Sequence, residues 1–217
     1  MRILALDTTA NFGSIALLKD NEVMEEVLLH SPEGFGPIIF DQIDRLLQRH
    51  SVTIQDIDLF AAASGPGSFT GVRVGLTAAK GLAEATGKPV VAVSNLMALA
   101  QCGSSLNRAA ILDARRGEIY GAVYDAELRA ISPEVVMPFQ PWLDSLPDSG
   151  IEFISTDFTP FRHGLKATRF EHAPILEQRV LAAAIGQTAL RLPPSDPAAI
   201  DANYVRRSDA ELLWKDR

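Results

Sequence analysis

Residues 3–18 read ILALDTTANFGSIALL, and residues 109–124 repeat the same plan as AAILDARRGEIYGAVY. In each stretch a short apolar run ends in Leu-Asp, at Asp7 and at Asp113, before a polar loop leads into a second apolar run. Apolar runs of this length, bounded by turn residues, are typical of buried strands. We interpret the two stretches as the first hairpins of two duplicated units.

Both halves of the chain predict the same order of elements around these hairpins. In the first half, apolar spacing predicts strands at 3–6, 14–18, 22–29, 59–63 and 89–93, and helices at 32–50 and 71–86. In the second half it predicts strands at 109–112, 119–124, 131–137 and 153–155, a short helix near Trp142 and a helix at 176–192. The prediction is an α/β fold of duplicated βββαβα units. This plan resembles the ribonuclease-H-like (actin/Hsp70/sugar-kinase-like) two-subdomain architecture.

Two polar or proline-rich stretches divide the chain. The short polar stretch 103–107 predicts an N-terminal subdomain over residues 1–104 and a C-terminal subdomain over residues 105–192. The segment Pro193-Pro-Ser-Asp-Pro197 predicts the start of a linker and tail over 193–217. Whether the tail packs back on the N-terminal subdomain is left open.

Composition excludes several function classes. A formal net charge of -7 argues against unaided nucleic-acid binding, which needs clustered Lys and Arg. The basic residues near 162–169 and 206–217 are interpreted as solvated faces. Cys102 is the single cysteine, which suits a reducing compartment, and no apolar run has the length of a signal-peptide core or a membrane span. We therefore expect a cytoplasmic location and no membrane partner.

The residues after Asp7 and Asp113 differ from those of a nucleotide site of this superfamily. Such a site needs glycines there, so that backbone N–H groups approach the phosphates. Here Thr8 and Thr9 follow the first Asp, and Ala114 and Arg115 follow the second. Hydroxyls and guanidinium groups still bind anions. The residues that we predict as residual nucleotide or anion contacts are Asp7, Thr8, Thr9, Gly65, Gly67, Ser68 and Arg115.

The string Ser64-Gly-Pro-Gly-Ser-Phe-Thr-Gly-Val-Arg73 lies between a predicted strand and a predicted helix. Loops of this kind present N–H groups at a helix N-terminus and hold anions. The string lacks the Lys-Ser/Thr ending of a Walker A loop. The other interpretation is a tight turn in which Ser68 or Thr70 caps the helix.

An ordered set of motifs resembles one family. The motifs are Asp7-Thr-Thr9, Ser64 to Arg73, Ala79-Lys-Gly-Leu82, Val91-Ala-Val-Ser94 and Asp113-Ala-Arg-Arg-Gly-Glu-Ile-Tyr120, and the tail Asn203-Tyr-Val-Arg206 agrees with them. Together they are similar to the TsaB (YeaZ) family, the bacterial subunit of tRNA threonylcarbamoyladenosine biosynthesis. Residues 125–200 carry little of this signature.

The resemblance implies a non-catalytic scaffold or activator subunit. Its implied partners are a TsaD-like catalytic paralogue and a TsaE-like ATPase, which together support threonylcarbamoyl transfer to adenosine 37 of certain tRNAs. ATP and metal are expected on the partner subunits, with no cofactor bound tightly here and tRNA met only through the complex. The paralogue's two metal-binding histidines align with Asn95 and Leu99, and leucine cannot ligate a metal. We therefore predict no catalytic and no metal-binding residue, and leave open a homodimer when the subunit is alone.

The resemblance implies a docking surface on the two helices of the first half, because proteins of this family pair with TsaD, or with themselves, through these helices. Apolar residues on the first helix cover a wider arc than one sheet needs, and small residues recur at every fourth position on the second. The residues predicted for the partner interface are Phe35, Ile39, Ile43, Leu46, Gly71, Gly75, Ala78 and Leu82. The alternative is that all of this packing is internal. The stretch Pro32-Glu-Gly-Phe-Gly-Pro37 departs from the family pattern and should shorten or delay the first helix.

An alternative function from another class is a small-molecule phosphotransferase or ATPase of the same superfamily, which would use Asp7 and Asp113. A nuclease needs more converging acidic groups than these two. Nothing in the sequence resembles a protease triad. The roles of Arg115 and Arg116, in a hairpin or against a partner, are not decided by the sequence.

Overall fold

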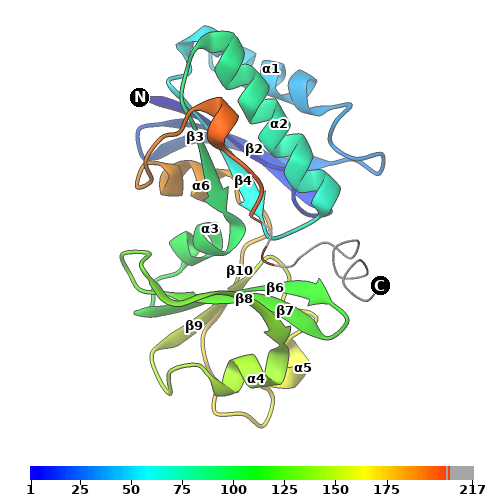
Figure 1. Cartoon of the computed structure of the whole chain (residues 1–217), viewed down its shortest axis with the longest axis vertical. Coiled ribbons are helices and arrows are strands. Elements are labelled where there is room, and N and C mark those ends of the chain that lie inside the picture. Colours follow the sequence, from blue (N-terminus) through cyan, green and yellow to red (C-terminus); the bar gives the residue numbers. More distant parts are fainter. Residues whose placement is uncertain (204, 206–217) are drawn as a thin grey trace, which may run out of the picture.

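The protein has two five-stranded sheets stacked along its long axis, with helices outside and between them (Figure 1). The computed structural model describes residues 1–203 and residue 205. Tyr204 and Arg206 of the tail motif, and the basic residues at 207, 215 and 217, lie outside the described residues. Among the described residues, no helix has the length and apolar character that crossing a membrane requires.

The first sheet has the strand order β3-β2-β1-β4-β5. Its strands are β1 Arg2–Asp7, β2 Phe12–Lys19, β3 Glu22–His30, β4 Leu59–Gly65 and β5 Val90–Ser94. The helices of this half are α1 Ile39–Arg49, the short η1 Ile54–Asp56, α2 Phe69–Thr86 and α3 Asn95–Cys102. β1 pairs antiparallel with β2 and parallel with β4, so the sheet is mixed.

The second sheet has the corresponding order β8-β7-β6-β9-β10. Its strands are β6 Asn107–Arg115, β7 Glu118–Tyr124, β8 Ala130–Pro138, β9 Ile151–Ser155 and β10 Ile175–Glu177. Its helices are α4 Phe139–Asp144, α5 Arg162–Leu165 and α6 Ala182–Ala189, followed by η2 Pro197–Ala199. Because order and pairing repeat, the predicted duplication is confirmed, and each unit is βββαβαβα. The first unit has one helix more than predicted, α3, and the second has one helix and one strand more, α5 and β10.

Successive side chains of the central strands point to opposite faces of the sheet, and because both kinds are apolar, each sheet has a hydrophobic core on both faces. In β1, Leu4 and Leu6 face the cluster that α1 and α2 cover, whereas Ile3 and Ala5 face the cluster that contains α3 and α6. Strands that are buried on both faces read as continuous apolar runs, which is how 3–6 and 59–63 appear in the sequence. The second sheet shares the cluster around α3 and α6, and its other face packs on α4 and α5.

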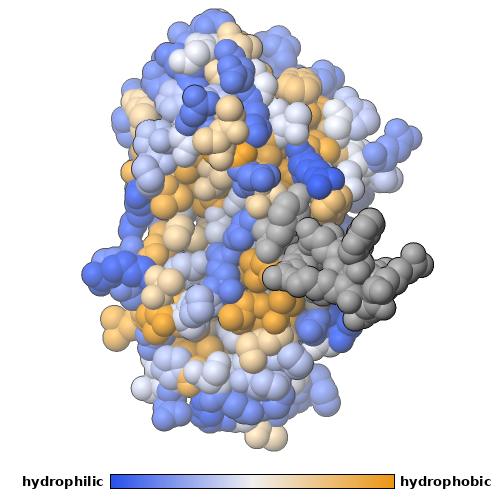
Figure 2. All heavy atoms as spheres, viewed as in Figure 1, coloured by the Kyte–Doolittle hydropathy of each residue, from blue (hydrophilic) through white to orange (hydrophobic). Residues whose placement is uncertain are grey.

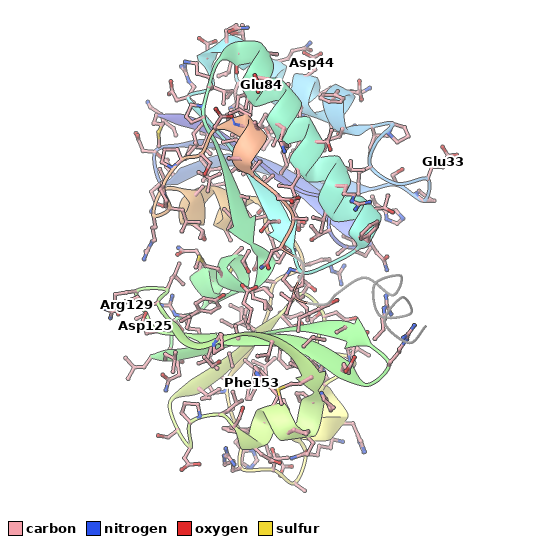
Figure 3. The ribbon with its side chains drawn as sticks, in the orientation of Figure 1. Glu33, Asp44, Glu84, Asp125, Arg129 and Phe153 are labelled. Atoms are coloured by element: carbon pink, nitrogen blue, oxygen red, sulfur yellow. The ribbon has the colours of Figure 1, made fainter. Side chains whose placement is uncertain are left out.

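The surface and the side chains follow this layering. Figure 2 shows apolar residues gathered on this face at the level between the two sheets, with hydrophilic residues dominating both far ends. In Figure 3, Phe153 lies within the second half, where it is fully buried. Arg129 and Asp125 lie together at the β7–β8 turn, where their charged groups are 2.7 Å apart.

Two predicted helices have different bounds in the structure. The predicted helix at 32–50 begins only at Ile39, because Gly34 adopts a positive φ of 85°, which a helix does not allow. Pro37 lies in the turn that leads into the helix, where Ile38 and Ile39 donate their N–H groups to the Phe35 backbone oxygen. Glu33 lies on this loop, which projects away from the first sheet (Figure 3). The predicted helix at 176–192 is wrong in its first part: Ile175–Glu177 forms β10, which pairs parallel with β9, and α6 follows at Ala182. Pairing at a sheet edge outweighs helical spacing there.

The packing also departs from the predicted division at 104/105. α6 belongs to the predicted C-terminal subdomain, but it packs against β1, β2, β4 and β5 of the first sheet. α3 belongs to the predicted N-terminal subdomain, but it packs against β6 and β7. α3 also contacts β4 and β5 of its own half, so it lies between the two sheets, whereas α6 is carried over to the first sheet. A boundary drawn from polar composition cannot show this arrangement.

Candidate functional site

A cleft of about 690 Å³ lies between the two halves, where the first hairpin of each unit turns. From the first half it is lined by Asp7, Thr9 and the loop 66–68. From the second half it is lined by residues 112–115 and by the segment 155–160. The carboxyl ends of sheet strands meet at this level, where α/β folds place their ligands.

The first-half corner of the cleft is a closed chain of hydrogen bonds. The Thr9 backbone N–H and hydroxyl both donate to Asp7 Oδ1, at 2.9 and 2.7 Å. The Thr9 hydroxyl oxygen accepts from the Asn95 side-chain amide, whose carbonyl oxygen accepts from the Gly65 N–H at 3.0 Å. The side chains of Asp7, Thr9 and Asn95 are all buried. Asp7 Oδ1, the Thr9 hydroxyl and the Asn95 amide are therefore bonded to one another within this corner.

Thr8 joins this corner to the first turns of α2. Its hydroxyl donates to the Gly71 backbone oxygen at 2.6 Å. A Cβ on Gly71 would overlap the Thr8 backbone oxygen, and one on Gly75 would lie 2.7 Å from Thr8 Oγ1. The small residues at these two positions thus have an internal reason: they let α2 approach the end of β1.

The loop between β4 and α2 is a capped turn. Ser68 donates its N–H to the Thr9 backbone oxygen at 2.7 Å, and its hydroxyl oxygen accepts from the Gly71 N–H at 3.3 Å. A Cβ on Gly67 would lie 2.7 Å from the Thr9 backbone oxygen. Of the two interpretations of this string, the structure contains the capped turn, with Ser68 as the capping residue. The N–H groups of Ser68 and Gly71 are bonded within the protein, so these two do not point at an anion.

Burial changes the acidity of Asp7. Removal from water raises the pKa of the Asp7 carboxyl above its ordinary value, because the charged form loses hydration. The two hydrogen bonds from Thr9 lower it, and the charge of Glu26 raises it further. The dominant cause is desolvation, so the folded state favours the protonated form of this residue more than the unfolded chain does.

The second-half corner is open to solvent. Arg116 and Gly117, with φ of 58° and 78°, form the two-residue loop between the paired residues Arg115 and Glu118, which is the backbone of a type I′ turn. Asp113 Oδ1 accepts from the Arg115 N–H at 2.8 Å, and the Arg115 guanidinium lies 3.6 Å from the same carboxylate. The Arg115 side chain is 80% exposed, so it stands at the mouth of the cleft.

The sequence reasoning missed several residues that line the cleft. Arg179 lies on the connection between β10 and α6. Its guanidinium carbon is 5.4 Å from the centre of the Phe12 ring. Hydrogen bonds from Thr159 hold the pKa of Asp157 below its ordinary value, with smaller contributions from Arg179 and Arg162. The sequence could have indicated Asn95, because it lies just after the predicted strand 89–93, and residues at the carboxyl ends of strands line the ligand sites of α/β folds. No such signal indicates Arg179, because only the fold carries it to the cleft.

The cleft carries charges of both signs but no metal-binding cluster. Among the described residues, no group of three or more His, Cys, Asp or Glu side chains is placed to hold a metal ion. Asn95 and Leu99, the positions aligned with metal-binding histidines, are both buried, and Asn95 is committed to Thr9 and Gly65. Four carboxylates, of Asp7, Asp113, Asp157 and Glu177, and two guanidinium groups, of Arg115 and Arg179, line the cleft, so it is polar and carries both signs of charge.

The residues predicted for partner docking lie mostly inside the first half. Phe35, Ile39, Ile43 and Leu46 are buried in the cluster that α1 and α2 share with the first sheet, and Leu82 packs against it. Gly71, Gly75 and Ala78 are also buried. Their apolar character is therefore explained by internal packing.

A shallow groove between α1 and α2 is the exposed part of the same region. It is lined by Gly36, Ile39, Phe40, Phe69, Thr70, Arg73, Val74, Thr77 and Ala78. Phe40 and Phe69 are 55% and 50% exposed, and the Arg73 guanidinium lies 3.7 Å above the Phe69 ring. Two of the predicted residues, Ile39 and Ala78, form part of this groove, whereas the exposed rings were not among those predicted.

A family model described as TsaD, tRNA N6-adenosine threonylcarbamoyltransferase, matches residues 37–188, which is more than half of the chain. The chain belongs to this family. Over its full length it is similar to the TsaB protein of Bacillus subtilis, with 29% identity over 99% of this chain and 98% of the relative. The TsaB protein of Escherichia coli is 38% identical over 60% of this chain and 58% of the relative.

Solved structures agree with these relatives. YeaZ from Pseudomonas aeruginosa has a TM-score of 0.77 at 25% identity, over 94% of this chain and 99% of that one. The ROK hexokinase of Thermus thermophilus, at 13% identity and a TM-score of 0.50 over 88% of this chain and 98% of that one, shares the fold. The resemblance to TsaB (YeaZ) and the predicted superfamily fold are confirmed.

Similarity to the family's transferases is partial. A tRNA N6-adenosine threonylcarbamoyltransferase of Methylocapsa acidiphila is 39% identical over 45% of this chain, but the match covers 34% of that protein. The chain thus resembles TsaB over its whole length and the transferases over a limited region.

Proposed function

We propose that this chain acts in tRNA threonylcarbamoyladenosine biosynthesis as a non-catalytic subunit that docks a TsaD-like catalytic paralogue. The role in this pathway rests on the full-length similarity to TsaB. The partner is suggested by the family model and by the transferase relatives, which share part of this chain's sequence.

The observation that carries the non-catalytic role is the state of the first-half corner. Asp7, Thr8 and Thr9 are committed to bonds with one another, with Asn95 and with α2. Leu99 stands where the paralogue's second histidine is expected and is fully buried. An enzyme of this fold needs accessible phosphate and metal contacts at that corner, so the supporting evidence favours a subunit over an enzyme.

The docking surface that we propose is the α1–α2 groove. Exposed aromatic side chains over an apolar groove are typical anchors of protein interfaces. Phe40 and Phe69 supply the rings, while Ile39 and Ala78 form part of the groove wall. A paralogue built on the same fold offers a related pair of helices, so two such grooves can pack as a helix bundle.

Co-purification of the chain with its own organism's TsaD-like protein tests this proposal. Phe40→Asp and Phe69→Asp place a charge in the groove on exposed side chains, so the fold is expected to survive. We expect each variant to weaken the complex at least about tenfold, the effect of losing one anchor. Isolated protein is expected to show no turnover, and transfer to tRNA is expected to require both chains.

Ile131→Asp is the matched control, because Ile131 is an exposed apolar residue, 49% accessible, on β8 of the other half. It should leave the complex unchanged. A complex that tolerates both groove variants, or one that Ile131→Asp disrupts equally, would rule out the groove as the docking surface.

Further partners follow from the same proposal. We place a TsaE-like ATPase in the assembly as the source of ATP turnover, expect tRNA to be met only through the complex, and locate the assembly in the cytoplasm. Without its paralogue, the chain is proposed to cover the groove by pairing with a second copy of itself. Analytical ultracentrifugation of the isolated chain tests this pairing: wild type is expected to sediment as a dimer and Phe69→Asp as a monomer.

The competing function is a small-molecule phosphotransferase or ATPase that uses the cleft with Asp7 and Asp113. The 690 Å³ volume and the exposed Arg115 leave room for an anionic ligand. ATP hydrolysis by the purified chain that Asp7→Ala abolishes would favour this function and count against the subunit proposal.

A further inference from the structure

Glu134 on β8 receives hydrogen bonds from three separate segments of the chain. Ser94, at the N-terminus of α3, and Tyr124, on β7, donate their hydroxyls to its Oε1, the latter at 2.9 Å. The Asn203 side-chain amide donates to its Oε2 at 2.6 Å. A carboxylate that accepts from several donors makes bonds stronger than those between neutral groups. One residue of the second sheet thus holds the first half, its own sheet and the tail.

The tail reaches Asn203 by running over the first half. Ser195 and Val90 exchange two backbone hydrogen bonds, of 2.9 and 3.2 Å, so the tail covers the edge of β5. The Ile200 side chain is buried against the cluster under α2, and its carbonyl oxygen accepts from the Lys80 ammonium at 2.9 Å. We call residues 195–203 the strap.

The strap ends on the loop that lines the cleft. The Asn203 N–H donates to the Ser64 backbone oxygen at 2.7 Å, and a Cβ on Gly65 would lie 3.2 Å from the Asn203 backbone oxygen. Gly65 also donates its N–H to Asn95 at the cleft floor. Asn203 therefore holds the end of β4 with its backbone and the second sheet with its side chain.

We propose that the strap is a conformational latch: the Asn203–Glu134 contact fixes the 64–68 loop, and with it the first-half wall of the cleft, against the second sheet. Without the contact, the strap loses its only bond to Glu134 among the described residues. The loop then keeps the backbone bond from Asn203 and its bonds to Asn95 and Thr9, all of which lie on the side of the first half, and no longer has this link to the second sheet. The latch concerns the isolated chain and does not depend on which partner the chain docks.

Exchanging the chemistry across the contact tests the latch. Asn203→Asp replaces the donor with a carboxylate beside Glu134, so like charges face each other. In the double variant Glu134→Gln with Asn203→Asp, the new amide at 134 donates to the carboxylate at 203, while its carbonyl oxygen accepts from Ser94 and Tyr124. The donor and acceptor are then reversed and the contact is restored.

Hydrogen–deuterium exchange of the isolated chain gives the readout. We expect Asn203→Asp to speed exchange about tenfold in 195–203 and in the 64–68 loop, the effect of losing one charge-assisted bond. The double variant is expected to return both segments to within about threefold of wild type. Asn107→Asp is the matched control, since its amide donates to the Ser149 backbone oxygen at 3.2 Å, away from the strap.

Exchange in the 109–112 segment, buried in the second sheet, distinguishes latch opening from unfolding. If Asn203→Asp accelerates that segment too, Asn203→Ser, which removes the donor without adding a charge, takes its place and should accelerate only the strap and the loop. The latch is refuted if the strap and loop exchange as in wild type in the variant that stays folded, or if the double variant exchanges as fast as Asn203→Asp.

Discussion

The two hairpin corners of the cleft occupy equivalent places in the duplicated fold, yet they are built in opposite ways. At the first corner Asp7, Thr8 and Thr9 are buried and paired with α2 and Asn95. At the second, Asp113 and Arg115 are exposed and paired only locally among the contacts described above. The same strand order therefore carries one corner that stabilises the fold and another that faces solvent. A repeated topology does not by itself repeat a ligand site.

Gly71→Ala should give the largest contrast. The new Cβ overlaps the Thr8 backbone oxygen, so α2 has to move away from β1, and we expect a loss of about 3 kcal/mol or more. At the second corner, a Cβ added at Gly117 has no atom within 4 Å. Gly117→Ala should therefore lower the free energy of unfolding by about 1 kcal/mol, the cost of a positive φ of 78° for alanine. Urea denaturation measures both free energies of unfolding.

The control for this prediction lies in the same helix. Gly81, inside α2, has nothing within 4 Å of its added Cβ, so Gly81→Ala should stabilise the protein by up to about 1 kcal/mol. Equal losses at positions 71 and 81 would show that the contact with Thr8 is not the cause.

Thr8→Val should give the next largest effect. It keeps the shape of the buried side chain but removes the hydroxyl that donates to Gly71, and it leaves that carbonyl without this bond. We expect a loss of about 1 to 3 kcal/mol, measured by thermal unfolding. Thr8→Ser, which keeps the donor, should lose less; the opposite ranking would mean that the methyl group matters more than the bond.

Asp7→Asn should change how stability depends on pH. Because the pKa of Asp7 is raised in the folded state, wild type loses stability as the pH rises from about 4 through that raised pKa. Asn accepts the same hydrogen bonds from Thr9 without a charge. We expect the variant to match wild type near pH 3 and to be the more stable of the two at pH 8.

Asp113→Asn is the comparison for this profile. Its side chain lies at the exposed second corner, so we expect Asp113→Asn to change the free energy of unfolding only a little. Unfolding curves at several pH values check both variants. An Asp7→Asn curve parallel to that of wild type would contradict the desolvation argument.

Arg116→Asn should have the smallest effect. Positions 116 and 117 both adopt positive φ, and Asn-Gly is the preferred pair for a type I′ turn. We expect a gain of about 0.5 kcal/mol in thermal unfolding. Arg116→Lys, which keeps the charge but not the turn preference, should show none.

The sequence predicted most of the fold because its signals are local. The repeated Leu-Asp ends, the apolar strands and the C-terminal glycine of α2, with a φ of 66° at Gly87, all act within a few residues. β10 was missed because three residues carry too little periodicity, and its strand state depends on β9. The site was predicted in part: Asp7 and Thr9 follow from their strand, but Arg179 reaches the cleft only through the fold. Burial of the docking residues was missed, since apolar spacing cannot separate a core from an interface.

The packing of α6 on the first sheet also bears on how the chain folds. The backbone N–H groups of Leu181 and Ala182 donate to the Ser14 hydroxyl, across 167 and 168 residues of sequence. The first sheet is therefore incomplete on one face until nearly the whole chain has been synthesised. Contacts of such long sequence separation slow folding and leave apolar surface exposed in the meantime. During synthesis, we expect the first half to reach its final structure only after α6 has been made and has packed on the first sheet.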